Sequence, residues 1–226
     1  MCGRFTLNGI PRKLAEYFEL SVDLDFTSSW NIAPSSQIYS IVANEKGSRH
    51  LRTMRWGLIP SWAKDETIGS KLINARSETV AEKPSFRSAF KYRRCLIPAS
   101  GFYEWKTEKG IKQPWYISPM SGEPMAFAGL WETWNPKEGE GIQSCCIITI
   151  ASNSFMEQIH NRMPVILNPE HWSLWLSQQE HLPDKLLPLM CSQNSKSMQV
   201  WPVTRELNQI GFRNDVELIE PLVDIS

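Results

Sequence analysis

The sequence lacks the features that mark several common classes of protein. It holds no apolar run that approaches the ~20 residues of a membrane-spanning helix, and its first residues lack the apolar stretch of a secretory signal peptide. Its five cysteines are odd in number and include no C-x-x-C pair, which argues against both a disulfide framework and a zinc site. We therefore expect a soluble, cytoplasmic protein that needs no metal ion or other cofactor and does not bind membranes.

The residues that are present suit one globular domain with a high aromatic content. A chain of 226 residues, of which 42% are apolar, can bury a full core, and we expect a single domain over residues 1–226. Ten Trp, nine Phe and five Tyr are typical of a β-rich core, and some of them could also stack on nucleic-acid bases.

The expected elements are short, and strands predominate. Period-two alternation predicts strands over 37–43, 50–56, 95–98, 101–107, 112–117, 124–134, 144–151, 200–203 and 216–219. Helical spacing and capping residues predict short helices over 11–20, 78–82, 85–92, 153–159, around 172–176 and over 184–190. Residues 57–69 are expected to form a loop, and the five strands between residues 95 and 151 a meander.

Cys2 has chemistry that no internal cysteine has, provided that Met1 is removed. It then carries a free α-amine and a thiol on adjacent carbons, and the amine, with an unperturbed pKa of about 7.7 to 8.0, is partly neutral and nucleophilic at pH 7. An aldehyde would form an imine with this amine and then close onto the sulfur as a five-membered thiazolidine. Gly3 lets a ligand come close. The alternative is that Cys2 is one more small residue in a flexible start.

Positive charge is concentrated in residues 49–94, although the whole chain has a formal net charge of zero. That segment contains eleven Lys or Arg and four Asp or Glu, a formal charge of +7 that the rest of the chain balances. Because aromatic residues such as Trp62 and Phe90 are interleaved with these charges, the pattern favours a nucleic acid as partner. A solvated basic face is the alternative.

Four further residues have the chemistry of a site. Glu104 alternates with bulky aromatic residues, and a carboxyl group desolvated in this way has a raised pKa and can donate a proton near neutral pH. His160 precedes Met-Pro in a partly apolar setting. Asn74 and Arg76 lie on one side of an extended stretch, where they offer an amide for a hydroxyl group and a guanidinium for a phosphate. Purely structural roles for Glu104 and His160 are the alternatives.

Six motifs follow one another along the chain: Met1-Cys2-Gly3-Arg4-Phe5, Trp30-Asn31-Ile32-Ala33-Pro34, Arg55-Trp56-Gly57, Ile73-Asn74-Ala75-Arg76-Ser77-Glu78-Thr79, Gly101-Phe102-Tyr103-Glu104-Trp105 and His160-Asn161-Arg162-Met163-Pro164. In this order they resemble the successive signatures of the SOS response-associated peptidase (SRAP) family. Together they are far more specific than any one of them. The resemblance runs from residue 2 to about residue 175, and the last 50 residues carry little of the pattern.

The resemblance implies a single α+β domain with a β-rich, barrel-like core and short peripheral helices, and we expect it to act as a monomer. It also implies removal of Met1 by an autopeptidase activity, binding to single-stranded DNA and covalent linkage to abasic sites. The catalytic residues implied are Cys2 as nucleophile, Asn74 and Glu104 for positioning and proton transfer, and His160 for Schiff-base formation or its reversal. The residues implied to hold the flanking phosphates are Arg4, Asn31 and Arg76.

Two other classes of function stay open on the residues alone. Glutamine amidotransferases also begin Met-Cys-Gly, so an N-terminal nucleophile amidohydrolase is the strongest rival. Their fourth residue is typically apolar, whereas Arg4 here favours an anion beside the nucleophile. The third class is a noncatalytic nucleic-acid-binding module, for which Cys2 would be irrelevant.

Overall fold

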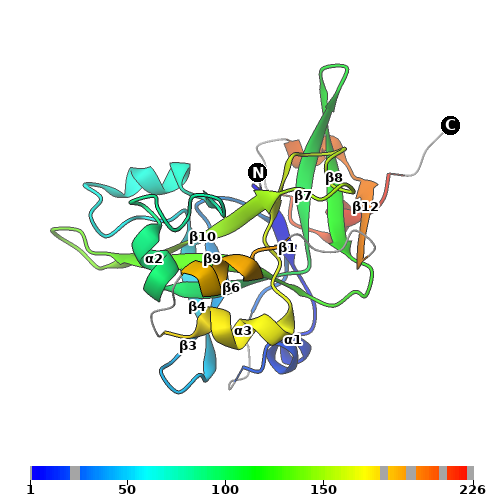
Figure 1. The fold of residues 1–226 in the computed structure, drawn as a ribbon. Coiled ribbons are helices and arrows are strands. Elements are labelled where there is room, and N and C mark those ends of the chain that lie inside the picture. The colour runs from blue at the N-terminus through cyan, green and yellow to red at the C-terminus, as the bar shows by residue number, and fades with distance from the viewer. Residues whose placement is uncertain (1, 21–25, 179–182, 192–196, 209–212, 223–226) are drawn as a thin grey trace.

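The computed structural model describes residues 2–20, 26–178, 183–191, 197–208 and 213–222. This part of the chain forms two β-sheets with short helices around them (Figure 1), so the predicted α+β class is confirmed. The first sheet has five strands in the order β12 (Met198–Pro202), β8 (Ile111–Pro119), β7 (Gly101–Glu108), β1 (Phe5–Leu7) and β2 (Ser29–Ile32).

The second sheet contains a closed five-stranded barrel. The strands of the whole sheet follow the order β11 (Arg162–Pro164), β10 (Ile142–Ala151), β4 (Arg49–Trp56), β3 (Gln37–Ala43), β6 (Arg94–Ala99) and β9 (Met125–Trp134). A seventh strand, β5 (Asn74–Arg76), also pairs with β10. Because β9 pairs with β10 as well as with β6, the ring of strands closes from β10 through β4, β3, β6 and β9 back to β10. The expected barrel-like core is confirmed.

The helices are short and lie around the sheets (Figure 1). They are α1 (Pro11–Tyr17), α2 (Arg87–Tyr92), α3 (Pro169–Leu176) and α4 (Pro183–Leu186), with 3₁₀ turns η1 (Glu66–Lys71), η2 (Leu187–Leu189), η4 (Arg205–Asn208) and η5 (Val216–Ile219). In the described ranges, no helix is both long and apolar enough to cross a membrane.

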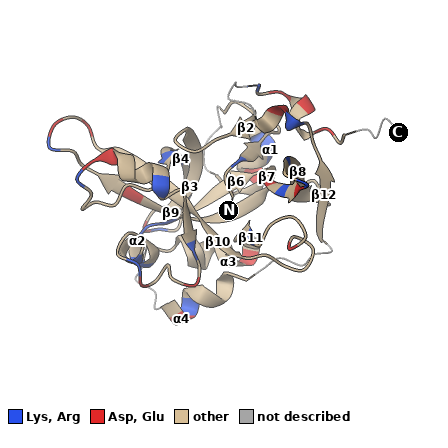
Figure 2. Ribbon diagram, turned by 90° about the horizontal axis from the view of Figure 1, so that it is seen from above, with Lys and Arg blue, Asp and Glu red and all other residues tan. Residues whose placement is uncertain are grey.

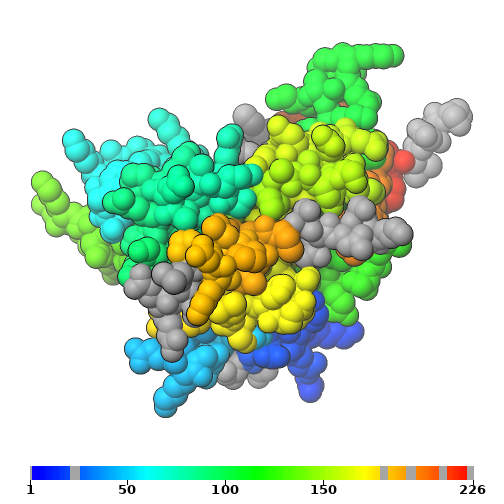
Figure 3. Space-filling view, in the orientation of Figure 1, coloured from blue at the N-terminus to red at the C-terminus, as the bar shows by residue number. Residues whose placement is uncertain are grey.

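The predicted meander is wrong, because its strands are divided between the two sheets. β7 and β8 form a hairpin in the first sheet, whereas β6 pairs with β9 and β9 with β10 in the second. The hairpin is therefore an insertion between two barrel strands, and its tip protrudes from the surface (Figure 3). At the switch between the sheets, Ser100 donates its main-chain N–H to the carbonyl of Thr6 at 2.8 Å.

Three local predictions also differ from the structure. Residues 216–219 form a 3₁₀ turn and not a strand, since the Asp215 carboxylate accepts a hydrogen bond from the main-chain N–H of Glu217 and caps the turn. In place of the helix predicted over 153–159, residues 154–159 form successive turns, although Asn153 does cap them by accepting from the N–H of Met156. Residues 78–82 are turns as well. The three- and four-residue strands β1, β2, β5 and β11 are too short for an alternating pattern to reveal.

β1 lies where the two sheets meet. Its main chain pairs with β7 through Phe5 opposite Phe102 and Thr6 opposite Gly101. Its Phe5 ring packs edge-on against two barrel rings, with centroids 5.2 Å from Trp56 and 5.9 Å from Phe127. The residues that precede β1 are thereby held between the first sheet and the barrel.

The basic residues of segment 49–94 do not form one continuous charged face. Arg94 is only 3% exposed and donates to the main-chain carbonyls of Trp175 and Phe90 at 2.7 and 2.8 Å. Arg49, Arg55 and Arg93 form ion pairs with Glu19, Glu66 and Glu132. Figure 2 shows Lys and Arg interspersed with Asp and Glu around the ribbon. Several charges that suggested a polyanion partner are therefore engaged in contacts within the protein itself.

Arg94→Met should destabilise the protein by about 2–4 kcal/mol, because it leaves several buried carbonyls without a donor. Burial already lowers the pKa of Arg94 to about 10. Urea denaturation measures the loss, and Arg87→Met, at an exposed position on α2, is the matched control with an expected change within about 0.5 kcal/mol. Equal effects of the two substitutions would contradict the structural role of Arg94.

Candidate active site around Cys2

Cys2 is held at the junction of the two sheets. Its side chain is fully buried and packs in the apolar cluster that contains Phe5 and Ile147. Burial, reinforced by the negative charge of Glu104, raises the pKa of the Cys2 thiol well above its ordinary value, and a hydrogen bond from the main-chain N–H of Arg4 opposes this shift. The thiol is therefore protonated at neutral pH, and any bond that it forms must include the transfer of its proton.

Asn74 reaches Cys2 from the second sheet. β5 pairs in parallel with β10, with Asn74 opposite Ile147, and Asn74 Nδ2 donates to the main-chain carbonyl of Cys2 at 2.9 Å. Within the part of the chain that the structure describes, Asn74 Oδ1 is buried and has no hydrogen-bond partner. Since buried polar atoms are nearly always paired, this oxygen is an acceptor available to a ligand beside Cys2.

Glu104 and His160 face each other at the same site. Glu104 lies on β7, is 2% exposed, and its Oε1 is 3.9 Å from Nδ1 of His160. Burial raises the pKa of Glu104, and the proximity of His160 opposes the shift in part. The predicted proton donor is thus a buried carboxyl group whose neutral form persists to higher pH than that of an exposed glutamate.

The main chain of Arg162 holds His160 in either protonation state. The N–H of Arg162 lies 3.0 Å from His160 Nδ1 and its carbonyl 3.2 Å from the same atom. Neutral Nδ1 can accept from the N–H, and protonated Nδ1 can donate to the carbonyl. The ring can therefore gain or lose a proton without being released from this position.

Arg162 and Glu78 were not selected from the sequence, although both lie in the quoted motifs. The guanidinium of Arg162 pairs with Glu78, with Nη2 at 3.0 Å from Oε2, and donates to the carbonyl of Thr149 at 2.6 Å. These contacts tie the His160 turn to β10 and to the turn after β5. The sequence feature that could have identified Arg162 is its position two residues after the candidate His160.

Arg4 and Asn31 form a pair beside this group. The guanidinium of Arg4 donates to Asn31 Oδ1, and the main-chain carbonyl of Arg4 accepts from the N–H of Tyr103 at 2.9 Å. Burial lowers the pKa of Arg4. Arg76 is exposed, two residues from Asn74 on β5, and so on the same side of that strand. The structure thus unites Cys2, Asn74, Glu104 and His160, with the Arg4–Asn31 pair next to them.

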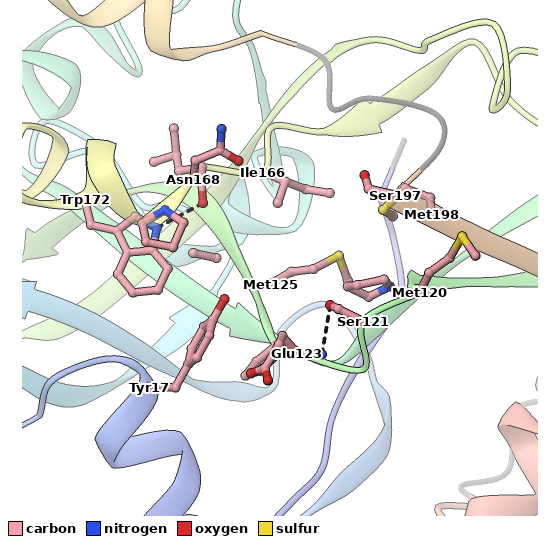
Figure 4. A pocket seen from close by; sticks show the side chains of 15 residues that line it. Tyr17, Met120, Ser121, Glu123, Met125, Ile166, Asn168, Trp172, Ser197 and Met198 are labelled. Carbon is pink, nitrogen blue, oxygen red and sulfur yellow. Dashed lines mark hydrogen bonds between the residues drawn. The ribbon is translucent and has the colours of Figure 1, made fainter.

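A separate pocket of about 320 Å³ lies between α1, the β8–β9 turn and the start of α3 (Figure 4). Its lining includes Tyr17, Met120 and Glu123 but none of the seven predicted site residues. Among the described residues, no group of three or more His, Cys, Asp and Glu side chains is arranged to hold a metal ion.

A family model described as SOS response associated peptidase (SRAP) matches residues 1–210. The chain belongs to the SRAP family. The resemblance of the six motifs is thereby confirmed, and the match extends beyond residue 175, where the recognisable motifs end.

Relatives in this family share most of the chain. The Bacillus subtilis abasic site processing protein YoqW is 44% identical over 224 residues, which are 97% of this chain and 99% of that protein. The Escherichia coli abasic site processing protein YedK is 32% identical over 186 residues, which are 79% of this chain and 81% of that protein.

Solved structures share the fold. A Bacteroides thetaiotaomicron protein, 24% identical, superposes with a TM-score of 0.88 over 98% of this chain and 100% of its own. A Bordetella bronchiseptica protein, 25% identical, gives a TM-score of 0.79 over 90% of this chain and 100% of its own.

Glu104→Gln should gain stability relative to wild type as the pH rises. Because the pKa of Glu104 is raised above its ordinary value of 4.5 in the folded state, the stability that this carboxyl contributes is present below pH 4.5 and is lost as the pH rises through the raised pKa. Glutamine cannot ionise, so the free energy of unfolding of the variant minus that of wild type should grow over this window. Urea denaturation between pH 4 and 8 measures the difference.

The control is Glu157→Gln, at an exposed position, which should show no such growth. A Glu104→Gln difference that stays constant with pH would show that this carboxyl has an ordinary pKa.

Proposed function

We propose that this SRAP protein binds single-stranded DNA and links covalently to abasic sites through Cys2 after Met1 has been removed. The names of its relatives, abasic site processing proteins, support the substrate. The observation that carries the proposal is the assembly of Cys2, Asn74, Glu104 and His160, which come from four distant segments of the chain.

Removal of Met1 is the peptidase step of the proposal. It converts the main-chain nitrogen of Cys2 into an amine whose pKa is near neutrality. The bond from Asn74 to the Cys2 carbonyl does not depend on that nitrogen, so it can hold the residue before and after the cleavage. The charge of Glu104 already acts on the thiol of the same residue, which supports the proposal that this buried acid serves the new amine.

Ring opening of the abasic sugar comes next. The C1′–O4′ bond breaks, Glu104 gives its proton to O4′, and the C1′ hydroxyl loses its proton as the aldehyde forms. The Cys2 amine attacks C1′, and loss of one water leaves an imine. His160, which the Arg162 main chain can hold in both protonation states, is suited to carry protons between these steps.

The thiol completes the reaction. Its sulfur bonds to C1′ while its proton passes to the imine nitrogen, so the products are a thiazolidine and the water already lost. Without this closure the imine would acidify the C2′ hydrogens and permit strand cleavage by β-elimination. Because the thiol is buried and protonated, closure needs the proton transfer that Glu104 or His160 can supply.

The strand itself would be held without reading its sequence. Arg4, Asn31 and Arg76 are proposed to contact the phosphates that flank the abasic site. Arg4 is suited to this because its guanidinium is already oriented by Asn31 and planar guanidinium groups match phosphate oxygens. Aromatic side chains would stack on neighbouring bases.

Cys2→Ala should abolish the covalent adduct while sparing noncovalent DNA binding, since it removes the thiol that closes the ring. Wild type and variant are incubated with abasic single-stranded DNA, and the product is followed by denaturing electrophoresis and intact mass. The wild-type mass should show that Met1 is absent and that the adduct equals protein plus DNA minus one water.

The matched control is Cys191→Ala, which changes the exposed cysteine and should crosslink as wild type does. A heat-stable adduct from Cys2→Ala would place the nucleophile elsewhere. Release of ammonia from glutamine by the wild type would instead favour the amidohydrolase.

Glu104→Gln should slow crosslinking at least tenfold with little change in DNA affinity, since loss of a general acid typically costs about 10² to 10⁴ in rate. Wild type should lose rate at high pH as Glu104 ionises, and the variant should lack that limb. Single-turnover rates from pH 5 to 9 measure both effects. An unchanged rate and profile would make Glu104 a structural residue and His160 the next candidate for the proton donor.

A further inference from the structure

The segment Arg213–Ile219 lies beyond residues 1–210, which the family model matches, yet it reaches the site. It contacts β2, which is the edge strand of the first sheet. On the outer side of an edge strand, the main-chain N–H and C=O groups have no neighbouring strand with which to form hydrogen bonds. Here residues 213 and 214 supply hydrogen-bond partners along that edge.

Asn214 binds β2 through a single side-chain oxygen. Its Oδ1 accepts from the main-chain N–H of Trp30 at 2.7 Å and from the hydroxyl of Ser29 at 3.0 Å. The carbonyl of Trp30 accepts from the hydroxyl of Tyr103 at 2.8 Å. Trp30 is thus held at both its main-chain groups, which restrains the position of the next residue, Asn31.

Asn31 connects this segment to Arg4. Its Nδ2 donates to the main-chain carbonyl of Arg213 at 2.9 Å, and its Oδ1 accepts from the Arg4 guanidinium. A side-chain amide has donors at one end and an acceptor at the other. The bond to Arg213 therefore decides that the acceptor end faces Arg4.

The segment is anchored independently of the site. Leu218 is fully buried in the apolar cluster of Tyr103 and Tyr116, and Trp201 Nε1 donates to the carbonyl of Ile219 at 2.8 Å. The guanidinium of Arg213 pairs with three carboxylates, those of Glu206, Asp215 and Glu217. Arg213 therefore contributes its carbonyl to the site, while the three carboxylates more than neutralise the charge of its guanidinium.

We propose that Arg213–Ile219 is a positioning element for phosphate binding. Asn214 fixes the segment on β2, the Arg213 carbonyl orients Asn31, and Asn31 directs the Arg4 guanidinium toward the DNA backbone. This inference rests on the proposed function, because it takes a DNA phosphate as the ligand of Arg4. A guanidinium has five N–H donors in a fixed fork, so donors beyond the one on Asn31 remain for the phosphate.

Asn214→Ala tests this inference. Noncovalent binding to an unpaired oligonucleotide without an abasic site is measured at several salt concentrations. The dissociation constant should rise about three- to tenfold, and the salt slope should fall by up to about one unit as Arg4 loses its phosphate. The crosslinking rate at saturating abasic DNA should change by less than about twofold, because the chemical step is untouched.

The matched control is Asn44→Ala. Asn44 Oδ1 also accepts two hydrogen bonds, from the main-chain N–H groups of Lys46 and Ser48, but in the β3–β4 turn. This variant should bind DNA as wild type does. If Asn214→Ala proves poorly folded by thermal unfolding, Ser29→Ala removes one of the two bonds to Asn214 and should give a smaller shift in the same direction.

Combination with Arg4→Ala separates the inference from the proposed function. If Asn214 acts through Arg4, Asn214→Ala should cause no further loss of affinity in the Arg4→Ala background. Equal losses in both backgrounds, or wild-type binding by Asn214→Ala, would overturn the inference. An unchanged affinity and salt slope for Arg4→Ala itself would instead overturn the proposed role of Arg4.

Discussion

The pairing of β1 with β7 is the interaction on which the site depends. Ordering the first residues of a chain costs about 1–2 kcal/mol each in backbone entropy, and here the ladder to β7 and the burial of Phe5 between Trp56 and Phe127 offset that cost. Because the strands are antiparallel, continuing this register beyond Phe5 places Cys2 near the position of Glu104 on β7. Any change that separates β1 from β7 would separate Cys2 from Glu104, even with every side chain of the candidate site intact.

Main-chain groups provide several of the contacts that hold the candidate site together. Asn74 holds the carbonyl of Cys2 and not its thiol, and the main chain of Arg162 holds His160 at a nitrogen that can change its protonation state. The low-dielectric surroundings raise the pKa of both the Cys2 thiol and the Glu104 carboxyl, so the neutral form of each group persists to higher pH than it would in water.

The arginines differ in how well their location could be predicted from the sequence. Arg4 and Arg76 were selected because they lie in family motifs, and both are at the site or on the same strand as one of its residues. Arg94 contributed equally to the predicted charge of segment 49–94, yet it is buried and satisfies main-chain carbonyls. Charge counted along a chain does not distinguish an exposed guanidinium from a buried one, because burial is set by contacts between distant residues.

The sequence by itself determined the family and the α+β class and indicated the candidate site residues, because these follow from residue types in a fixed order. Only the tertiary structure decided which strands pair, so the expected meander became a hairpin inserted between two barrel strands. It also placed Asn214 and Arg213 against β2 and Asn31, about 180 residues away along the chain. Which strands pair depends on the burial of complementary faces and on hydrogen bonds between main-chain groups that are far apart in the sequence. A local sequence pattern therefore does not predict the pairing.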